Sequence, residues 1–221
     1  MDKDANEALF RQVRVAHRLL ASYYKRVHQL ISDVSGDDRL GLKFFVWGPT
    51  EYSRPCRRTT QVLGRCSWEL LPGVLPEYLF LHGPEGKPQQ PGEWLLAMHV
   101  ISDTVVFDEE KGEDIDAVEI QVSADDAHSV LRCYLIAPHK ELDLYWADDI
   151  WKGVEYYPDC TERPERQCVN EGDQIYASAF EMPLETLTGK DSVETLVQKI
   201  VAYRDVVLPQ AVRNLKEVNN G

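Results

Sequence analysis

The sequence predicts an α+β fold in which a helix near each end of the chain packs on a central antiparallel sheet of about five or six strands, connected mainly as a meander. Three observations predict this fold. Apolar residues recur at helical spacing near both ends, apolar runs of strand length fill the middle, and short polar turns separate these runs. With 221 residues the chain has the length of one large domain, so we expect a single globular domain over residues 1–221.

Residues 5–34 are expected to form the first helix. Asp4 is a suitable N-cap with Glu7 three positions later, and Gly36 is a suitable terminator. Apolar side chains recur at steps of three and four along one stripe, which we expect to pack on the sheet: Leu9, Val13, Ala16, Leu20, Tyr24, Val27, Ile31 and Val34. The opposite face is interpreted as a solvated basic face, and it carries Arg11, Arg14, Arg18, Lys25 and Arg26.

The middle of the chain is expected to form the sheet. Strands are predicted at residues 42–47, 78–82, 93–107, 117–122, 130–136 and 175–180, with a bulge in the longest one at Ser102-Asp103. The run from Trp94 to Met98 is apolar at consecutive positions, which indicates that both faces of the sheet are covered, and we expect the helices to cover them. Residues 191–216 are predicted to form the second helix, with Pro209 as a kink or a break.

The composition is typical of a cytoplasmic protein. Apolar residues make up 43% of the chain, no apolar run approaches the ~20 residues that a membrane helix needs, and the charged N-terminus lacks a secretory signal. The five cysteines are odd in number and include no C-x-x-C pair. We therefore expect reduced thiols, no metal and no cofactor. A cysteine metal site and a redox pair remain open as alternatives.

Charge is distributed unevenly along the chain. Residues 1–66 carry 12 basic and 7 acidic side chains, whereas residues 67–221 carry 12 basic and 30 acidic ones, for a total net charge of −13. An acidic surface repels nucleic acid and attracts basic partners. We therefore expect a protein partner with a basic surface and no membrane partner. Nucleic acid is expected only through an arginine-rich loop, and the oligomeric state is left open.

That loop is the first candidate site. Four arginines fall within twelve residues of an otherwise acidic chain, and they are Arg54, Arg57, Arg58 and Arg65. Guanidinium groups match the geometry of phosphate and carboxylate, so these residues are predicted to bind an anion. Pairing with the carboxylates of the chain itself is the structural alternative. No glycine-rich phosphate loop accompanies the arginines.

An acidic segment and an aromatic segment form the second candidate site. Residues 103–126 hold ten carboxylates against one lysine, and residues 143–157 are rich in tryptophan and tyrosine. Carboxylates speed encounter with a basic partner, and aromatic rings supply binding hot spots. The predicted partner-binding residues are Asp108, Glu109, Glu110, Glu113, Asp114, Asp116, Trp146, Trp151 and Tyr156. The alternatives are a solvated loop for the acids and additional core packing for the aromatics.

Two function classes follow. We favour a non-enzymatic interaction protein that binds a basic macromolecular partner, such as an inhibitor, an immunity-type protein or a nucleic-acid mimic, because no catalytic motif is recognisable. The alternative is a metal-dependent phosphodiester hydrolase that combines scattered carboxylates with the Arg54–Arg65 loop. The triplet Glu109-Glu110-Lys111, with Glu93 and Asp103 upstream, is a poor match to the carboxylate and E-x-K arrangement of restriction-type nucleases. No catalytic residue can be assigned.

Overall fold

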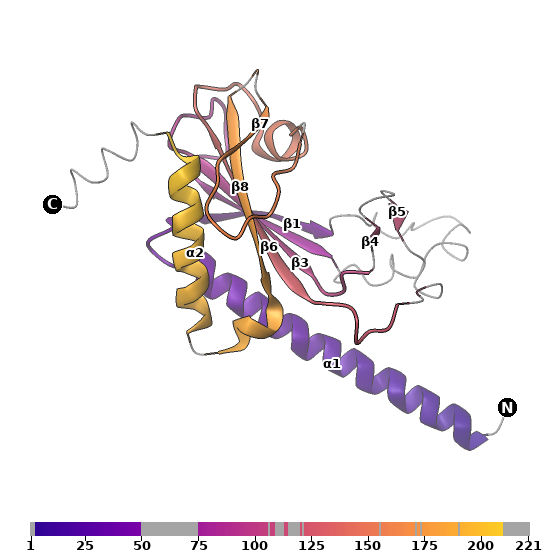
Figure 1. Ribbon diagram of the computed structural model, residues 1–221. Helices are drawn as coiled ribbons and strands as arrows, with labels where there is room; N and C mark the ends of the chain where they lie inside the picture. The colour runs from indigo at the N-terminus through magenta and orange to yellow at the C-terminus, as the bar shows by residue number, and fades with distance from the viewer. Residues whose placement is uncertain are drawn as a thin grey trace.

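One antiparallel sheet of six strands lies at the centre of the computed structural model, with a helix before it and a helix after it (Figure 1). The structure describes residues 3–49, 75–105, 107–108, 113–114, 120, 122–154, 156–170, 172, 174–189 and 191–209. The spatial order of the strands is β1 (Lys43–Pro49), β2 (Pro76–His82), β3 (Trp94–Ile101), β6 (Val130–Pro138), β8 (Ile175–Pro183) and β7 (Gln167–Asn170). The predicted α+β fold is thereby confirmed.

The sheet departs from a simple meander at one end. β8 follows β7 in the chain but lies between β6 and β7 in the sheet, so β7 and β1 are the outermost strands. The predicted strand 93–107 ends at Ile101, and a separate two-stranded sheet follows, formed by β4 (Phe107–Asp108) and β5 (Glu113–Asp114). Of the predicted strand 117–122, only Ile120 and Val122 lie among the described residues, and neither is in a strand.

The two helices share one face of the sheet. Helix α1 (Lys3–Ser35) contributes Val27, Ile31 and Val34 to the core beneath β3 and β6, and helix α2 (Ser192–Val207) packs into the same cluster. Consecutive strand residues alternate between the two faces of the sheet. Leu96 and Met98 are two positions apart, so both point toward the helices and belong to this core. The prediction that both helices pack on one sheet is confirmed for these parts of the helices.

The opposite face of the sheet is covered by an irregular segment instead of a helix. Leu95 and Ala97 point to this side, where residues 142–154 pack over them. A single turn of π-helix, Trp146–Trp151, provides most of the cover. The expectation that the two long helices cover both faces is therefore wrong, because one face takes both helices and the other takes this segment.

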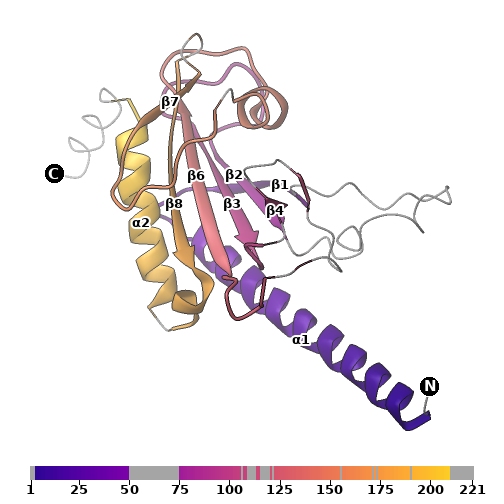
Figure 2. The same ribbon diagram turned by 45° about the vertical axis from the view of Figure 1, so that its right-hand side comes forward.

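Helix α1 extends far beyond the sheet (Figures 1 and 2). Val34 is fully buried and Ile31 is 4% exposed, whereas Leu9 and Val13 near the other end are 50% and 43% exposed. The apolar stripe was therefore predicted correctly as a pattern, but its first half does not pack on the sheet. Helix α2 ends at Val207, and Leu208 is extended because it precedes Pro209. The predicted residues 210–216 of this helix lie outside the described residues.

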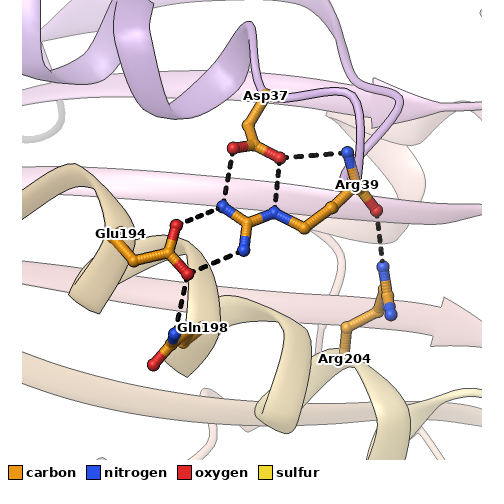
Figure 3. A network of polar contacts seen from close by, with 5 residues as sticks. All are labelled: Asp37, Arg39, Glu194, Gln198 and Arg204. Carbon is orange, nitrogen blue, oxygen red and sulfur yellow. Dashed lines mark hydrogen bonds and ion pairs between the residues drawn. The ribbon is translucent and has the colours of Figure 1, made fainter.

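A polar network joins the end of α1 to α2 (Figure 3). The guanidinium of Arg39 donates to both carboxylate oxygens of Asp37 at 2.8 Å and to both of Glu194 at 2.7 and 2.9 Å. The hydrogen bonds that Arg39 donates to Asp37 lower the pKa of this carboxyl to about 2. Arg204 of α2 donates to the backbone carbonyl of Arg39 at 3.0 Å. The network fixes the turn after α1 against the helix that shares its sheet face.

Candidate interaction surface

The predicted anion site and half of the predicted acidic partner-binding residues lie outside the described residues. Arg54, Arg57, Arg58 and Arg65 lie outside the described residues, as do Glu109, Glu110 and Asp116. Asp108, Glu113 and Asp114 belong to the β4–β5 pair, in which Asp108 lies opposite Glu113 and Phe107 lies opposite Asp114. The backbone of this hairpin therefore brings three of the predicted carboxylate-bearing residues together.

The two predicted tryptophans point into the molecule. Trp146 is 1% exposed and its indole N–H donates to the carbonyl of Pro84, while Trp151 is 2% exposed. The prediction that these rings lie on an exposed face is wrong. The reason is the π-helical turn, in which Ile150 N–H donates to Tyr145 O and Lys152 N–H donates to Ala147 O, each five residues back. A turn of this width places residues five apart on the same side.

The tyrosines and carboxylates of the same segment point outward. Tyr145, Tyr156 and Tyr157 are 57%, 66% and 53% exposed, and the side chains of Asp143 and Asp148 are 87% and 75% exposed. We call these five residues the acidic-aromatic surface. Tyr156, one of the predicted partner-binding residues, is thus exposed. Tyr145 and Tyr157 belong to the predicted aromatic segment 143–157, although they were not among the residues named for partner binding.

This surface already holds a lysine of the chain itself. The ammonium of Lys87 lies 4.0 Å from the centre of the Tyr145 ring and donates to the backbone carbonyl of Asp143 at 2.8 Å. The Asp143 carboxylate is 3.9 Å from the same nitrogen. A ring face, a carbonyl and a carboxylate are the groups that attract an ammonium ion. The arrangement shows that this segment provides cation-binding geometry.

A second polar feature crosses the sheet on the same face as Trp151. Glu77, His99, Arg132 and Glu181 lie opposite one another on β2, β3, β6 and β8, and so form one row. The Nε2 atom of His99 is 3.5 Å from Glu77 Oε2, and Arg132 pairs with Glu181 at 3.0 Å. Exposure rises along the row, from 13% for the Glu77 side chain to 36% for that of Glu181.

The environment of Glu77 favours its charged form. Burial alone would raise the pKa of this carboxyl. The hydrogen bonds from His99 and Trp151 and the charges of His99 and Lys152 together lower the pKa by more than burial raises it, so the net shift is downward. The indole N–H of Trp151 donates to Glu77 Oε2 at 3.0 Å. The rings of Tyr134 and Trp151 pack edgewise on the imidazole of His99 at 5.1 and 5.4 Å between centroids. A carboxylate beside an imidazole can transfer a proton, but here aromatic rings cover the pair.

The described part of the chain contains no group of three or more His, Cys, Asp or Glu residues placed to hold a metal ion. In the same part, no helix combines the length and the apolar character needed to cross a membrane.

A family model described only as PM0109 matches residues 3–207, which span both helices and the whole sheet. No curated protein matches the chain. No solved structure matches it either.

Proposed function

We propose that this chain, which belongs to the PM0109 family, is a non-enzymatic interaction protein that binds a basic macromolecular partner through its acidic-aromatic surface. The observation that carries the proposal is the position of Lys87, which the surface holds between the ring of Tyr145 and the backbone of Asp143. A lysine or arginine of a partner would meet the same kinds of group on this surface, namely tyrosine ring faces, backbone carbonyls and carboxylates. The net charge of −13 attracts such a partner over a longer range.

The two kinds of residue would contribute differently to binding. Exposed carboxylates such as Asp143 and Asp148 act before contact, because they steer a basic partner toward the surface and raise the association rate. Tyrosine rings act after contact, because they bury apolar area and slow dissociation. The ten carboxylates of residues 103–126 would extend the steering effect, including Asp108, Glu113 and Asp114 of the β4–β5 hairpin.

The experiment begins with affinity purification of the partner from the native cell, followed by binding kinetics with two variants. Asp143→Asn/Asp148→Asn should slow association and reduce its salt dependence. Tyr156→Ala should speed dissociation instead, since its exposed ring is not needed to fill the core. The matched control is Asp38→Asn/Glu185→Gln, which removes two exposed carboxylates outside the surface. An acidic captured partner, or unchanged kinetics in both test variants, would count against the proposal.

The metal-dependent hydrolase remains the alternative, and it rests on residues of the Arg54–Arg65 loop that lie outside the described ranges. A nuclease assay of the purified chain with Mg²⁺ or Mn²⁺ tests it directly. Cleavage that disappears in Arg57→Ala/Arg58→Ala would favour this alternative over a binding function.

A further inference from the structure

The acidic-aromatic surface holds its own lysine through contacts that suit an ammonium group. The Lys87 ammonium donates to the backbone carbonyl of Asp143 at 2.8 Å and lies 4.0 Å from the centre of the Tyr145 ring. The Asp143 carboxylate, at 3.9 Å, attracts the same nitrogen but is beyond the distance of a hydrogen bond. The cation therefore rests on one ring face and one carbonyl oxygen, and the nearby carboxylate adds only its charge.

The position of the Asp143 carbonyl does not depend on this lysine. On one side of it, Leu142 and Gln89 exchange two backbone hydrogen bonds, at 2.8 and 3.0 Å. On the other side, the Leu144 N–H donates to the side-chain carbonyl of Gln89 at 3.3 Å. Gln89 is fully buried, so water does not compete for these bonds. The carbonyl acceptor therefore keeps its place when the lysine leaves.

The residue that carries the ring is fixed in the same way. The backbone N–H of Tyr145 donates to the carboxylate of Asp149 at 2.7 Å, and its carbonyl accepts the N–H groups of Asp149 and Ile150. The indole N–H of Trp146 donates to the Pro84 carbonyl at 3.2 Å and joins this turn to the loop that carries the lysine. The ring and the carbonyl thus form a site that is organised before any cation binds.

Lys87 itself is held by contacts that water weakens. The Tyr145 ring is 57% exposed, and the side chains of Asp143 and Lys87 are 87% and 26% exposed. Ion pairs and cation–π contacts at such exposed positions contribute little to stability. The loop around Lys87 does not need the ammonium either, because Gln89 bonds to the far segment and its side chain donates to the Gly86 carbonyl at 3.1 Å. The ammonium can therefore leave its position while the loop stays folded.

We infer that the Tyr145 ring and the Asp143 carbonyl form a recognition site for a lysine side chain, and that Lys87 occupies this site until a lysine of the partner displaces it. The inference rests on the proposed function and identifies the group that the partner presents. A single carbonyl acceptor and a ring face suit a compact ammonium. A guanidinium binds best where two coplanar acceptors match its fork, so arginine fits this site less well.

Competition between the two lysines determines the apparent affinity for a partner. Lys87 belongs to the same chain as the site, so it competes at a high effective concentration. A ligand that binds only the open site has its apparent affinity reduced by the fraction of molecules in which the site is open. Removal of the Lys87 ammonium should therefore strengthen the binding of an external lysine, although the chain loses a surface contact.

Calorimetric titration of the full chain with an acetylated and amidated peptide of alternating glycine and lysine tests the inference. Lys87→Met should strengthen binding about 3- to 10-fold, because the site is then open. The matched control is Lys140→Met, which removes the same charge from a lysine outside the surface that also donates to a backbone carbonyl, that of Gly172. This control should change the affinity less than about two-fold. Equal gains from the two variants would reflect net charge alone and would overturn the inference.

The ring and the kind of cation are tested with the same titration. The gain from Lys87→Met should disappear in Lys87→Met/Tyr145→Leu, which lacks the ring face. A peptide with arginine in place of lysine should bind more weakly and gain less from Lys87→Met. A peptide of trimethylated lysine keeps the charge but cannot donate to the Asp143 carbonyl, so it should also bind more weakly. Equal binding of the three peptides to Lys87→Met would overturn the lysine site.

Displacement of Lys87 is visible in the NMR spectrum of the wild-type chain. Its ε-methylene protons should be shifted upfield by the Tyr145 ring, and they should lose this shift when the lysine peptide saturates the site. Signals that do not move at saturation would overturn the inference. The captured partner separates this inference from the proposed function. If Asp143→Asn/Asp148→Asn weakens its binding and Lys87→Met leaves it unchanged, the lysine site is wrong and the proposed function stands. A partner without a basic surface would overturn both.

Discussion

His99 and Glu77 lie opposite each other on β3 and β2, with Nε2 of the imidazole 3.5 Å from Oε2 of the carboxylate. The same oxygen accepts the indole N–H of Trp151 at 3.0 Å. The aromatic segment over this face of the sheet is therefore anchored by a carboxylate that comes from a strand. This anchor makes the stability of the segment dependent on the charge of one glutamate.

The first prediction concerns pH. The folded-state pKa of Glu77 is lowered from its ordinary value of 4.5, so its contribution to stability is present above about pH 4.5 and is lost as pH falls through the folded-state pKa. Glu77→Gln should therefore be less stable than wild type near pH 6, and the gap in unfolding free energy should narrow as pH falls from about 5 to 3. Urea unfolding of both proteins at several pH values measures it. If the difference in unfolding free energy between the two proteins stays constant over this pH range, the pKa of Glu77 is not lowered in the folded protein.

The second prediction concerns the tryptophan anchor. Trp151→Phe keeps most of the ring but removes the N–H donor to the half-buried carboxylate of Glu77, which should cost about 1–3 kcal/mol of unfolding free energy. Trp151→Ala also leaves a cavity and should cost about 3–5 kcal/mol. Tyr156→Ala, at a position that is 66% exposed in the same segment, should stay within about 0.5 kcal/mol of wild type. Equal effects at the two positions would show that Trp151 is not an anchor.

The third prediction concerns the two halves of α1. Ile31 is 4% exposed and packs in the core, so Ile31→Ala should lower the unfolding free energy by about 2–4 kcal/mol. Leu19 is 68% exposed on the same helix, and Leu19→Ala should change the stability of the monomer by no more than about 0.5 kcal/mol. Thermal or urea unfolding at low protein concentration compares them. A large loss from Leu19→Ala in the monomer would mean that the exposed half packs on its own chain.

Local periodicity explains how much of this architecture could be predicted. The helical stripe of α1 and the apolar strands 78–82 and 130–136 are properties of neighbouring residues, so the sequence alone indicates them. Where the sheet stops beneath α1 depends on tertiary packing, and no local pattern separates buried Val27 from exposed Val13. The inward direction of Trp146 and Trp151 depends on a π-helical turn, whose spacing matches neither the helical nor the strand period.

The candidate site was harder to predict for the same reason. Glu77 and His99 are separated by a strand, a turn and another strand, and only the register of β2 on β3 places them opposite each other. The lysine-binding geometry at Tyr145 depends on Lys87, from a distant part of the chain. Composition could indicate that residues 143–157 carry aromatic and acidic side chains, but not which of them point outward.

The fourth prediction concerns the network between α1 and α2. Arg204 is mostly buried and donates to the carbonyl of Arg39, so Arg204→Met should lower the unfolding free energy by about 1.5–3 kcal/mol. Arg39 is exposed, and Arg39→Lys should produce a smaller loss that shrinks in high salt, because a lysine cannot form the two-pronged contacts to Asp37 and Glu194. Urea unfolding of both variants at low and high salt measures the two losses of unfolding free energy. A larger loss from Arg39→Lys than from Arg204→Met would contradict this prediction.

The fifth prediction concerns the cysteines. Cys133 is fully buried, and burial raises the pKa of its thiol well above the ordinary value, so it should not react with a thiol reagent in the folded protein. Cys160 and Cys168 are exposed and form no disulfide, so both should react. Titration of the denatured, unreduced protein should return about five thiols if the expected reduced state holds for Cys56 and Cys66, which lie outside the described residues. Cys133→Ser is the control: it should remove the one thiol that reacts only after unfolding and leave the reaction of the exposed thiols unchanged. Fewer than five thiols after denaturation, or stoichiometric zinc in the purified protein, would contradict the reduced, metal-free state and favour the redox pair or the metal site that the cysteine spacing leaves open.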